Sequence, residues 1–395
     1  MKISIVGLGY VGLPLAVAAA QSGFEVAGLD IDVKKITDIN HGISPIHDVS
    51  SNEVSELINQ KKLITSTDFS HVRDSQIILI CVPTPLNSEK LPDLSFIENA
   101  IRSVAKNLSK NSLLILESTV APGTTRNYLV PLILQETNYS NSEIQIAFSP
   151  ERIDPANISW GVKNTPKIVA GLTPESLENA ISFYSKFIIN VIRCSSLEIA
   201  ETAKLLENSF RLVNISFINE IAKFCHEMGI DVHEVIEAAA TKPYGFMSFY
   251  PSVGIGGHCI PVDPVYLADR ASKIGSPTRL IELSLLINGE LPAYFVSRAE
   301  KLIGNLRAKR IIIVGVSYKP NVSDVRETPV KPLISALIKE GAQVCWHDDL
   351  VKEWNGEKSI ELSGGFDLAI LSTPHDYLDL TKLGNVPVLN TRGSI

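Results

Sequence analysis

Hydrophobic and polar residues in the first half of the chain follow the pattern of strands that alternate with helices. Apolar runs of strand length occur at 2–6, 24–29, 76–82, 113–117 and 144–148. The run at 13–20 is instead typical of a buried helix. Because strands that alternate with helices build a parallel sheet covered on both faces, we predict a doubly wound α/β fold for this region.

From about residue 196 the pattern becomes that of one long helix, which ends at Gly229, a typical C-cap. A helix of about 32 residues is long for a globular protein and often supplies a dimer interface. Lys204, Asn208 and Arg211 lie at i, i+4 and i+7, so they share one face of it. Two interpretations of this face stay open: a solvated polar stripe, or donors to a developing oxyanion.

The C-terminal part repeats the opening pattern. A strand is expected at 309–316, a helix at 332–340, and further strands at 343–347, 368–372 and 388–390. We therefore predict an α/β protein with two doubly wound Rossmann-like domains, joined by a long central helix and a helical middle domain. The expected division is 1–195 for the first domain, 196–303 for the central domain with its catalytic loop, and 304–395 for the second Rossmann-like domain.

A glycine-rich motif between the first strand and the first helix predicts dinucleotide binding. Gly7, Gly9 and Gly12 form GxGxxG. The first glycine permits a tight turn, the second a close approach to a pyrophosphate, and the third close packing of helix and strand. Asp30 ends the second strand, where a carboxylate binds the ribose hydroxyls and repels a 2′-phosphate, which favours NAD over NADP. For Asp30 an ordinary strand-end residue is the alternative.

Polar residues follow three later strands of this region. Thr84, Thr119 and Glu151 lie in the loops directly after the strands expected at 76–82, 113–117 and 144–148. Ligands of open parallel sheets bind outside the carboxyl ends of the strands, so we expect these residues to face the nicotinamide and its reaction partner. Turn formation is the alternative for each of them alone.

The loop after the strand expected at 309–316 lacks GxGxxG and carries Lys319 and Arg326 instead. Basic residues at this place suggest a second anionic ligand, such as a nucleotide diphosphate. Ordinary surface charge in a loop is the alternative.

Composition narrows the classes of function. The 395 residues suggest two or three domains, and 45% hydrophobic with 20% charged residues is typical of a soluble globular protein. A net charge of −7 argues against general nucleic-acid binding. We found no signal peptide and no apolar run of membrane-spanning length, so we expect a cytoplasmic protein without a membrane partner. Five widely spaced cysteines fit a reducing compartment and contain no CxxC metal pair.

One of these cysteines, Cys259, lies in the glycine-rich segment 254–264, and Asp263 follows it by four residues. We interpret the glycines as clearing space around the thiol. A thiol on such a loop is typical of a nucleophile, whereas structural cysteines usually lie in apolar helices or strands. A bystander cysteine in a tight loop is the alternative. We assign His258 to loop packing or substrate contact rather than to base catalysis.

Taken together, these segments resemble the UDP-glucose/GDP-mannose dehydrogenase family over essentially the whole chain. The matching motifs are GLGYVGLP, ESTVAPGTT, SPERI, AKLLENSFR with VNISFINE, and GGHCIPVDP with GVSYKPNVSDVRETP behind it. The resemblance implies oxidation of the C6 alcohol of a nucleotide sugar to a carboxylate with two NAD⁺. It also implies that Cys259 forms a thiohemiacetal and then a thioester, which water cleaves.

The resemblance further implies site residues. The catalytic residues would be Cys259, Lys204, Asn208, Asp263, Glu151 and Thr119, with Lys204 and Asn208 at the oxyanion and the last three handling water. The cofactor residues would be Gly7, Gly9, Tyr10, Val11, Gly12, Asp30, Lys35, Thr84, Thr119 and Arg326. The substrate residues would be Glu151, Arg152, Lys204, Asn208, Arg211, Tyr250, Gly256, Lys319 and Arg392. No metal is expected.

The segments TKPYGF and FYPSVGIGGHCIPVDP most resemble UDP-N-acetylglucosamine 6-dehydrogenases. Two departures stand out: Lys242 lies near where UDP-glucose members carry an arginine contributed across the dimer, and Ala156 replaces a glycine of the PERIxPG pattern. We expect UDP-N-acetylglucosamine as the substrate, for surface polysaccharide synthesis, with UDP-N-acetylmannosamine and UDP-glucose as alternatives. A two-electron hydroxyacid dehydrogenase and an inactive NAD-binding regulator are the rivals from other classes.

Overall fold

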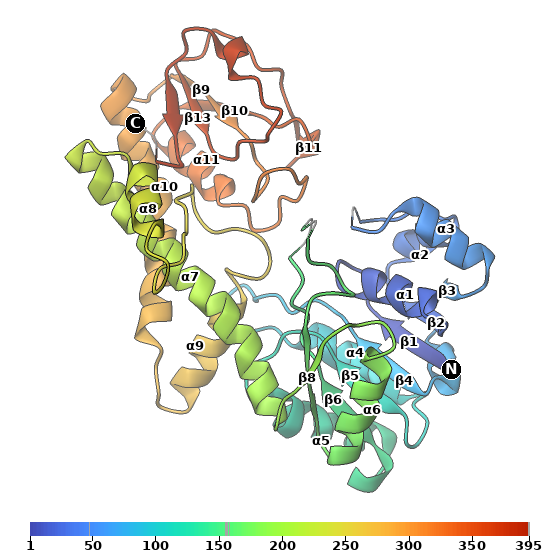
Figure 1. Cartoon of the computed structure of the whole chain (residues 1–395). Coiled ribbons are helices and arrows are strands. Elements are labelled where there is room, and N and C mark those ends of the chain that lie inside the picture. Colours follow the sequence, from blue (N-terminus) through green and yellow to red (C-terminus); the bar gives the residue numbers. More distant parts are fainter. Residues whose placement is uncertain (47, 155–156, 158, 394–395) are drawn as a thin grey trace. The chain divides into compact units, whose positions relative to one another are not determined.

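The computed structural model describes residues 1–46, 48–154, 157 and 159–393 (Figure 1). Ala156, the departure noted in the PERIxPG pattern, lies outside the described residues. The chain divides into two compact units, Met1–Leu206 and Glu207–Ile395, and the boundary falls within the helix α7 (Leu197–Met228). Each unit has its own sheet, and most of the strands in each are parallel to their neighbours.

The first unit contains an eight-stranded sheet in the order β3-β2-β1-β4-β5-β6-β7-β8. Its strands are β1 (Lys2–Val6), β2 (Glu25–Leu29), β3 (Leu63–Ser66), β4 (Ile77–Ile80), β5 (Leu113–Leu116), β6 (Gln145–Phe148), β7 (Lys167–Gly171) and β8 (Val191–Arg193). Neighbouring strands are parallel except β6 and β7. The strand order reverses between β1 and β4, which is the point where open α/β sheets bind nucleotides.

Helices cover both faces of this sheet. They are α1 (Gly12–Gln21), α2 (Val33–Asn40), α3 (Ser51–Asn59), α4 (Ser95–Ala105), α5 (Val130–Thr137) and α6 (Pro174–Tyr184), with short helical turns at Phe69–Asp74, Thr125–Leu129 and Asn141–Glu143. Ile77 and Leu79 of β4 pack into the core with α1, α2, α3 and α6, whereas Ile78 and Ile80 pack into the core with α4 and α5. Alternate side chains of one strand thus serve two cores, as in a doubly wound fold.

The second unit begins with helices and ends with a smaller sheet. The helices are the second part of α7, α8 (Val232–Ala240), α9 (Asp263–Lys273), α10 (Arg279–Ile303) and α11 (Val330–Lys339). The parallel sheet has the order β10-β9-β13-β14, with β9 (Arg310–Val314), β10 (Gln343–His347), β13 (Leu368–Leu371) and β14 (Val388–Asn390). A two-stranded hairpin of β11 (Glu353–Trp354) and β12 (Glu357–Lys358) and a turn at Leu380–Leu383 complete the unit.

The predicted fold class is confirmed. Ile311 and Ile313 of β9 pack into one core with α10 and α11, and Ile312 and Val314 pack into another on the opposite face. Among the described residues, no helix combines the length and the apolar character that crossing a membrane requires.

Candidate active site

The glycines of the first loop have the geometry that the motif predicts. Gly7 has φ +91°, and a Cβ on it would lie 2.7 Å from the Cys81 carbonyl oxygen. A Cβ on Gly12 would lie 1.8 Å from the Gly7 oxygen, so helix and strand approach closely there. A Cβ on Gly9 would meet no atom within 4 Å, which leaves this backbone open to a ligand. The loop therefore fits a dinucleotide pyrophosphate.

The start of α1 and the end of β2 supply polar groups beside this loop. Val11, the N-cap of α1, makes no side-chain capping bond, so the helix N-terminus keeps N–H groups for an anion. Asp30 Oδ2 accepts hydrogen bonds from Leu8 N at 2.8 Å and from Lys35 Nζ at 2.7 Å. Burial by itself would raise the pKa of Asp30, but Lys35 and the backbone N–H groups bring it below its ordinary value. Asp30 is therefore an ionised acceptor at the expected ribose position.

The loops after β4 and β5 carry Thr84 and Thr119, and both residues are half-buried. A residue that the sequence analysis missed holds the second loop. Glu201, buried on α7, accepts hydrogen bonds from Gly123 N at 2.6 Å and Thr125 N at 2.9 Å. The first turns of α7 thereby fix the loop that contains Thr119.

Glu151 belongs to a buried charge cluster that the sequence did not indicate. Lys167 Nζ, at the start of β7, lies 2.8 Å from Glu117 Oε2 and 3.4 Å from Glu151 Oε2. Tyr184 donates a hydrogen bond of 2.5 Å to Glu117 Oε1. A lysine before an apolar strand is an ordinary surface pattern, so nothing in the sequence marked Lys167. The cluster sets the position of Glu151 after β6.

The same cluster sets the charge of Glu151. Burial would raise the pKa of Glu151, but Lys167, then the N–H groups of Ile153 and Arg152, and then Lys204 lower it below the ordinary value. Burial raises the pKa of Glu117 despite its contact with Lys167. Arg152 also donates from its guanidinium to the Pro166 carbonyl oxygen at 2.8 Å, which anchors the loop. Glu151 therefore stays ionised at neutral pH.

The predicted polar face of α7 is only partly solvated. Lys204 and Asn208 are both 8% exposed, whereas Arg211 is exposed. A solvated stripe thus describes Arg211 alone. The buried lysine and amide are one helical turn apart, as their i, i+4 spacing requires.

In the second unit, the cysteine loop leads directly into α9. Asp263 N donates to the Cys259 carbonyl oxygen at 2.8 Å, so the two residues are one turn apart. Asp263 is the first residue of α9 and is buried, while Cys259 is half-buried and its thiol is not part of a disulfide. Asn208 Nδ2 donates to Asp263 Oδ2 at 2.6 Å. The structure thus brings the thiol segment, the carboxylate and the amide of α7 together.

The glycines before Cys259 have a different role from the one we inferred. A Cβ on Gly256 would lie 2.7 Å from Pro329 Cδ, and one on Gly257, where φ is +80°, would lie 3.0 Å from the Tyr318 ring. Gly257 N also donates to the Arg326 carbonyl oxygen at 3.1 Å. These glycines allow the cysteine loop to pack on the segment 318–329. The interpretation that they clear space around the thiol is therefore wrong for both.

The predicted substrate residues Tyr250 and Arg392 share a neighbour that the sequence analysis missed, His233 of α8. The His233 ring stacks on the Tyr250 ring with 5.8 Å between centroids. His233 Nε2 lies 2.6 Å from the Arg392 carbonyl oxygen, to which it donates. Elsewhere in this unit, Arg326 forms an ion pair with Asp324 at 2.5 Å. Its predicted contact with the cofactor stays a prediction.

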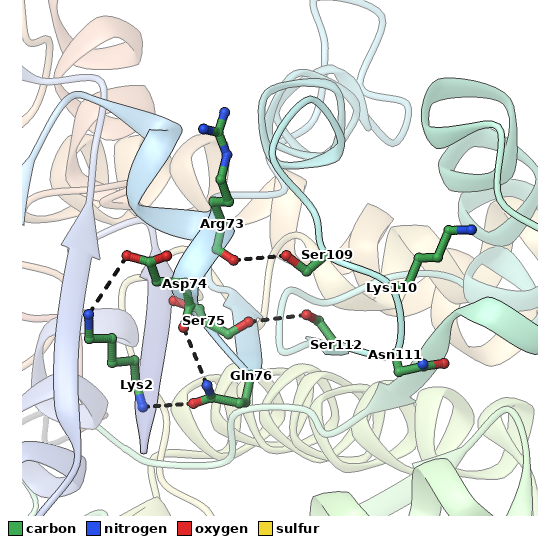
Figure 2. A pocket seen from close by; sticks show the side chains of 9 residues that line it. All are labelled: Lys2, Arg73, Asp74, Ser75, Gln76, Ser109, Lys110, Asn111 and Ser112. Carbon is green, nitrogen blue, oxygen red and sulfur yellow. Dashed lines mark hydrogen bonds and ion pairs between the residues drawn. The ribbon is translucent and has the colours of Figure 1, made fainter.

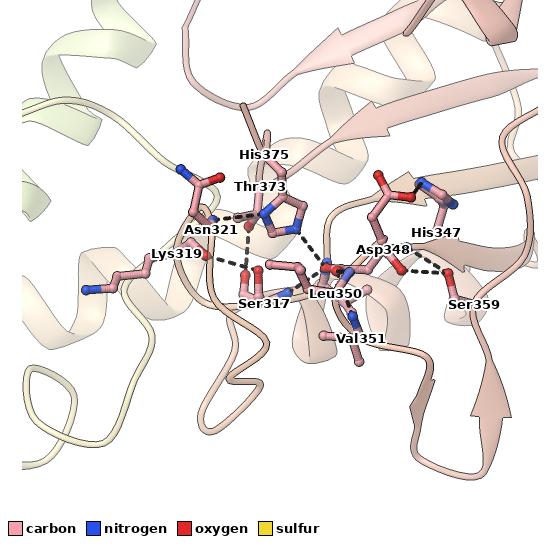
Figure 3. A network of polar contacts seen from close by, with 12 residues as sticks. Ser317, Lys319, Asn321, His347, Asp348, Leu350, Val351, Ser359, Thr373 and His375 are labelled. Carbon is pink, nitrogen blue, oxygen red and sulfur yellow. Dashed lines mark hydrogen bonds and ion pairs between the residues drawn. The ribbon is translucent and has the colours of Figure 1, made fainter. Parts of the chain in front are cut away.

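Lys319 lies in the loop after β9, within a polar network that Figure 3 shows. Asp348, which follows β10, accepts hydrogen bonds from Val316 N at 2.8 Å and from Val351 N at 3.0 Å. His375, after β13, contacts both Asp348 and the Lys319 loop. A signal for Asp348 was available, because it follows its strand as Asp30 follows β2.

The first unit also has an open pocket of about 600 Å³, and Figure 2 shows the residues that line it. Lys2 begins β1, and Gln76 and Ser112 directly precede β4 and β5, so this cavity lies at the amino ends of the strands. Some of its polar groups bond to one another, for example Lys2 N to Gln76 Oε1 at 2.8 Å, and others bond to residues outside it, as Lys110 does to Glu143. It is separate from the nucleotide edge. Within the part of the chain that the structure describes, no group of acidic, cysteine or histidine side chains could hold a metal ion.

The sequence matches three successive domains of one family. These are the NAD binding domain of the UDP-glucose/GDP-mannose dehydrogenase family at residues 1–188, its central domain at 198–290 and its UDP binding domain at 312–391. A UDP-N-acetyl-D-glucosamine 6-dehydrogenase of Pseudomonas aeruginosa is 34% identical over 388 residues, which are 95% of this chain and 90% of that protein. A UDP-N-acetyl-D-mannosamine dehydrogenase of Pyrococcus horikoshii is 32% identical over 383 residues, with the same coverage of both chains.

Solved structures agree with this assignment. The structure of the UDP-D-ManNAc dehydrogenase from Pyrococcus horikoshii aligns over 100% of this chain and 96% of its own, with a TM-score of 0.91 and 30% identity. A UDP-glucose dehydrogenase from Pyrobaculum islandicum has the same fold, with a TM-score of 0.91 at 24% identity over 99% of this chain and 94% of its own. The chain therefore belongs to the UDP-glucose/GDP-mannose dehydrogenase family and is an NAD-dependent nucleotide-sugar dehydrogenase.

Proposed function

We propose that this enzyme oxidises the C6 alcohol of a UDP-sugar to a carboxylate in two steps, through a thioester on Cys259. The observation that carries the proposal is the cluster of Cys259, Asp263 and Asn208 at the start of α9. A thiol followed one helical turn later by a buried, amide-bound carboxylate suits acyl formation and hydrolysis. A two-electron dehydrogenase needs no such thiol.

In this mechanism NAD⁺ supplies the hydride acceptor for each oxidation. Between the two, the Cys259 sulfur adds to the C6 aldehyde and forms the C–S bond of a thiohemiacetal, whose carbon can then lose hydride. Water adds to the resulting thioester, and the sulfur leaves as the C–S bond breaks. Asp263 takes the proton of that water, and Lys204 and Asn208 donate to the oxyanion. Thr119 and Glu151 keep their implied role in positioning water.

We assign the substrate as UDP-N-acetylglucosamine, for surface polysaccharide synthesis, on the TKPYGF and GGHCIPVDP segments. The similarity to a UDP-N-acetyl-D-glucosamine 6-dehydrogenase supports this choice. UDP-N-acetylmannosamine is the second candidate, because relatives with that activity are 32% identical. Lys319 and Arg392 are our proposed contacts to the nucleotide diphosphate, and Lys242 our candidate in place of the arginine contributed across the dimer. We also propose a cytoplasmic enzyme with the division 1–195, 196–303 and 304–395.

The test is to measure how many NADH form per sugar with UDP-N-acetylglucosamine, UDP-N-acetylmannosamine and UDP-glucose as separate substrates. Mass spectrometry identifies each sugar product. We expect two NADH per sugar and a product heavier by one oxygen and lighter by two hydrogens. Cys259→Ala should abolish carboxylate formation, whereas Cys225→Ala, within an apolar core, should retain it. One NADH per sugar would contradict the proposal, and a strong preference for UDP-glucose would contradict the choice of sugar.

We further propose that the enzyme is a homodimer or a higher homo-oligomer built from such dimers. Phe217 and Phe224 of α7 and Leu283 and Leu286 of α10 are large apolar side chains that are each more than half exposed. The two helices are in contact, since Ser216 Oγ donates to the Ser284 carbonyl oxygen at 3.0 Å. A second copy is the expected cover for such a face. Light scattering should give a dimer that Phe217→Glu dissociates and that Ile338→Glu, at an exposed site on α11, leaves intact. A wild-type monomer would contradict this.

A further inference from the structure

The loop after β9 is built like the dinucleotide loop after β1. Gly315 has φ +85°, and its N–H donates to the His347 carbonyl oxygen at 2.8 Å. Gly7 has φ +91° and donates to Leu29 O at 2.7 Å. The following N–H group donates to the strand-end acid at 2.8 Å in both units, to Asp30 in the first and to Asp348 in the second.

Asp30 and Asp348 differ in how far their carboxylate oxygens can still bind a ligand. Both oxygens of Asp348 are occupied: Oδ2 accepts from Val316 N and Ser317 N at 2.8 and 3.3 Å. Oδ1 accepts from Leu350 N and Val351 N at 2.9 and 3.0 Å. At 1% exposure Asp348 offers no surface to a ribose. Its hydrogen bonds instead hold the loop after β9 in place.

His375 connects Asp348 to the segment that carries Lys319. Its Nδ1 accepts a hydrogen bond from Asn321 N at 2.9 Å, so Nδ1 has no proton. The neutral ring therefore carries its proton on Nε2, which lies 3.2 Å from Asp348 Oδ2. This contact is close enough for electrostatic attraction, although it is not aligned as an ideal hydrogen bond. The ring is buried and stacks on Tyr377 with 5.6 Å between centroids.

Further bonds close the turn around Lys319, as Figure 3 shows for most of them. Thr373 Oγ1 donates to Ser317 O at 2.7 Å, and Ser317 Oγ donates to Lys319 O at 3.0 Å. Asn321, at φ +63°, donates from its side chain to Asp376 Oδ2 at 2.8 Å. The turn is thus held before and after Lys319 by residues that follow β13.

We propose that His375 is a positioning residue for binding of the nucleotide diphosphate, because it fixes the turn from which Lys319 acts. The inference rests on the proposed function, in which Lys319 binds the diphosphate. A buried acceptor at Nδ1 restricts the backbone at Asn321, and a lysine whose backbone is preorganised loses less entropy when it binds an anion. His375 itself touches the loop rather than the ligand.

Two substitutions separate the roles of the two ring nitrogens of His375. His375→Asn keeps an acceptor at the place of Nδ1, and His375→Gln keeps a polar group at the place of Nε2 only. We expect His375→Gln to weaken binding of UDP, measured by calorimetry on the full-length enzyme, by about tenfold, and His375→Asn to stay within about threefold of the wild type. In turnover, His375→Gln should raise KM for the UDP-sugar while kcat and KM for NAD⁺ change little.

His347→Gln is the matched control, since this histidine on β10 lies 2.6 Å from the Ile360 carbonyl oxygen and serves another segment. It should bind UDP like the wild type even where its Tm falls. Equal UDP affinity of His375→Gln and wild type, or an equal loss in His375→Asn and His375→Gln, would overturn the inference. Should His375→Gln not fold, Asp376→Ala replaces it, because the exposed Asp376 accepts the side-chain hydrogen bond of Asn321. We expect this variant to weaken binding of UDP severalfold, and an unchanged affinity would then overturn the inference. A wild-type enzyme that binds no UDP would instead refute the proposed function itself.

Discussion

Asn208 of α7 donates a hydrogen bond from its amide to Asp263, with 2.6 Å between Nδ2 and Oδ2, and both side chains are buried. Asp263 is also the first residue of α9, where the helix dipole favours a negative charge. An amide and a helix start therefore support one carboxylate, one turn after Cys259. This pairing gives Asn208 a role that does not depend on any ligand.

Asn208→Leu tests that role, because leucine has a similar size and no donor. The variant leaves the buried Asp263 carboxylate with one hydrogen-bond donor fewer. This loss should lower the free energy of unfolding by about 1 to 3 kcal/mol. The loss of a donor to the transition state should also lower kcat by about a hundredfold or more. Urea unfolding and steady-state turnover measure the two effects. Asn214→Leu is the control, since its amide donates to the Phe210 carbonyl oxygen of the same helix. A comparable loss in both variants would argue against a specific role of Asn208.

The fold was largely predictable because the hydrophobic periodicity and the positions of the glycines both depend on local structure. The strands expected at 2–6, 343–347 and 388–390 have the same bounds as β1, β10 and β14. Helix α7 extends from Leu197 to Met228, as its pattern indicates. Strands β3, β7 and β8 were not predicted: β8 has only three residues, two of them exposed, and nothing local marks the antiparallel reversal between β6 and β7. Pairing direction depends on the connection rather than on the strand's own residues.

The site was less predictable, because its supporting residues come from distant parts of the chain. Lys167 and His375 are separated by 16 and 54 residues from the groups that they contact, Glu151 and Asn321. A sequence pattern identifies residues on one strand or one helix face, but not which distant side chain fills a buried position. The glycines at 256 and 257 illustrate the same limit, since their neighbours are Pro329 and Tyr318.

Lys167 provides a prediction about pH. The pKa of Glu151 lies below its ordinary value of 4.5, so this carboxylate stabilises the fold above about pH 4.5, and that contribution is lost as the pH falls. Lys167→Met removes the largest of the contributions that lower this pKa. We expect the pKa to rise and the acid limb of the kcat profile to move to higher pH. A pH–rate profile checks this against Lys163→Met, at an exposed lysine four residues earlier. A folded Lys167→Met variant with an unmoved acid limb would contradict the prediction.

Lys167→Met should also destabilise the first unit by about 3 to 5 kcal/mol, because it leaves buried carboxylates without their cation. Adding Glu117→Gln removes one of these charges and keeps a hydrogen-bond partner for Tyr184. We therefore expect the double variant to be more stable than Lys167→Met alone. Thermal unfolding of the two single variants and the double variant measures this coupling, and strictly additive losses would show that the charges act independently.

Asp30 should decide which dinucleotide is accepted. Its pKa is lowered by Lys35 and by N–H groups against the effect of burial, so it is ionised at neutral pH and repels a 2′-phosphate. Asp30→Ala removes both the acceptor for the ribose hydroxyls and this repulsion. We expect the Kd for NAD to rise by about tenfold and the preference for NAD over NADP to shrink, because a lost charge-assisted hydrogen bond costs about 1.5 to 3 kcal/mol. Fluorescence titration with both cofactors measures this, with Asp38→Ala as the control, since Asp38 pairs with Lys34 at 2.6 Å on α2. An unchanged NAD to NADP ratio in Asp30→Ala would mean that the discrimination lies elsewhere in the loop.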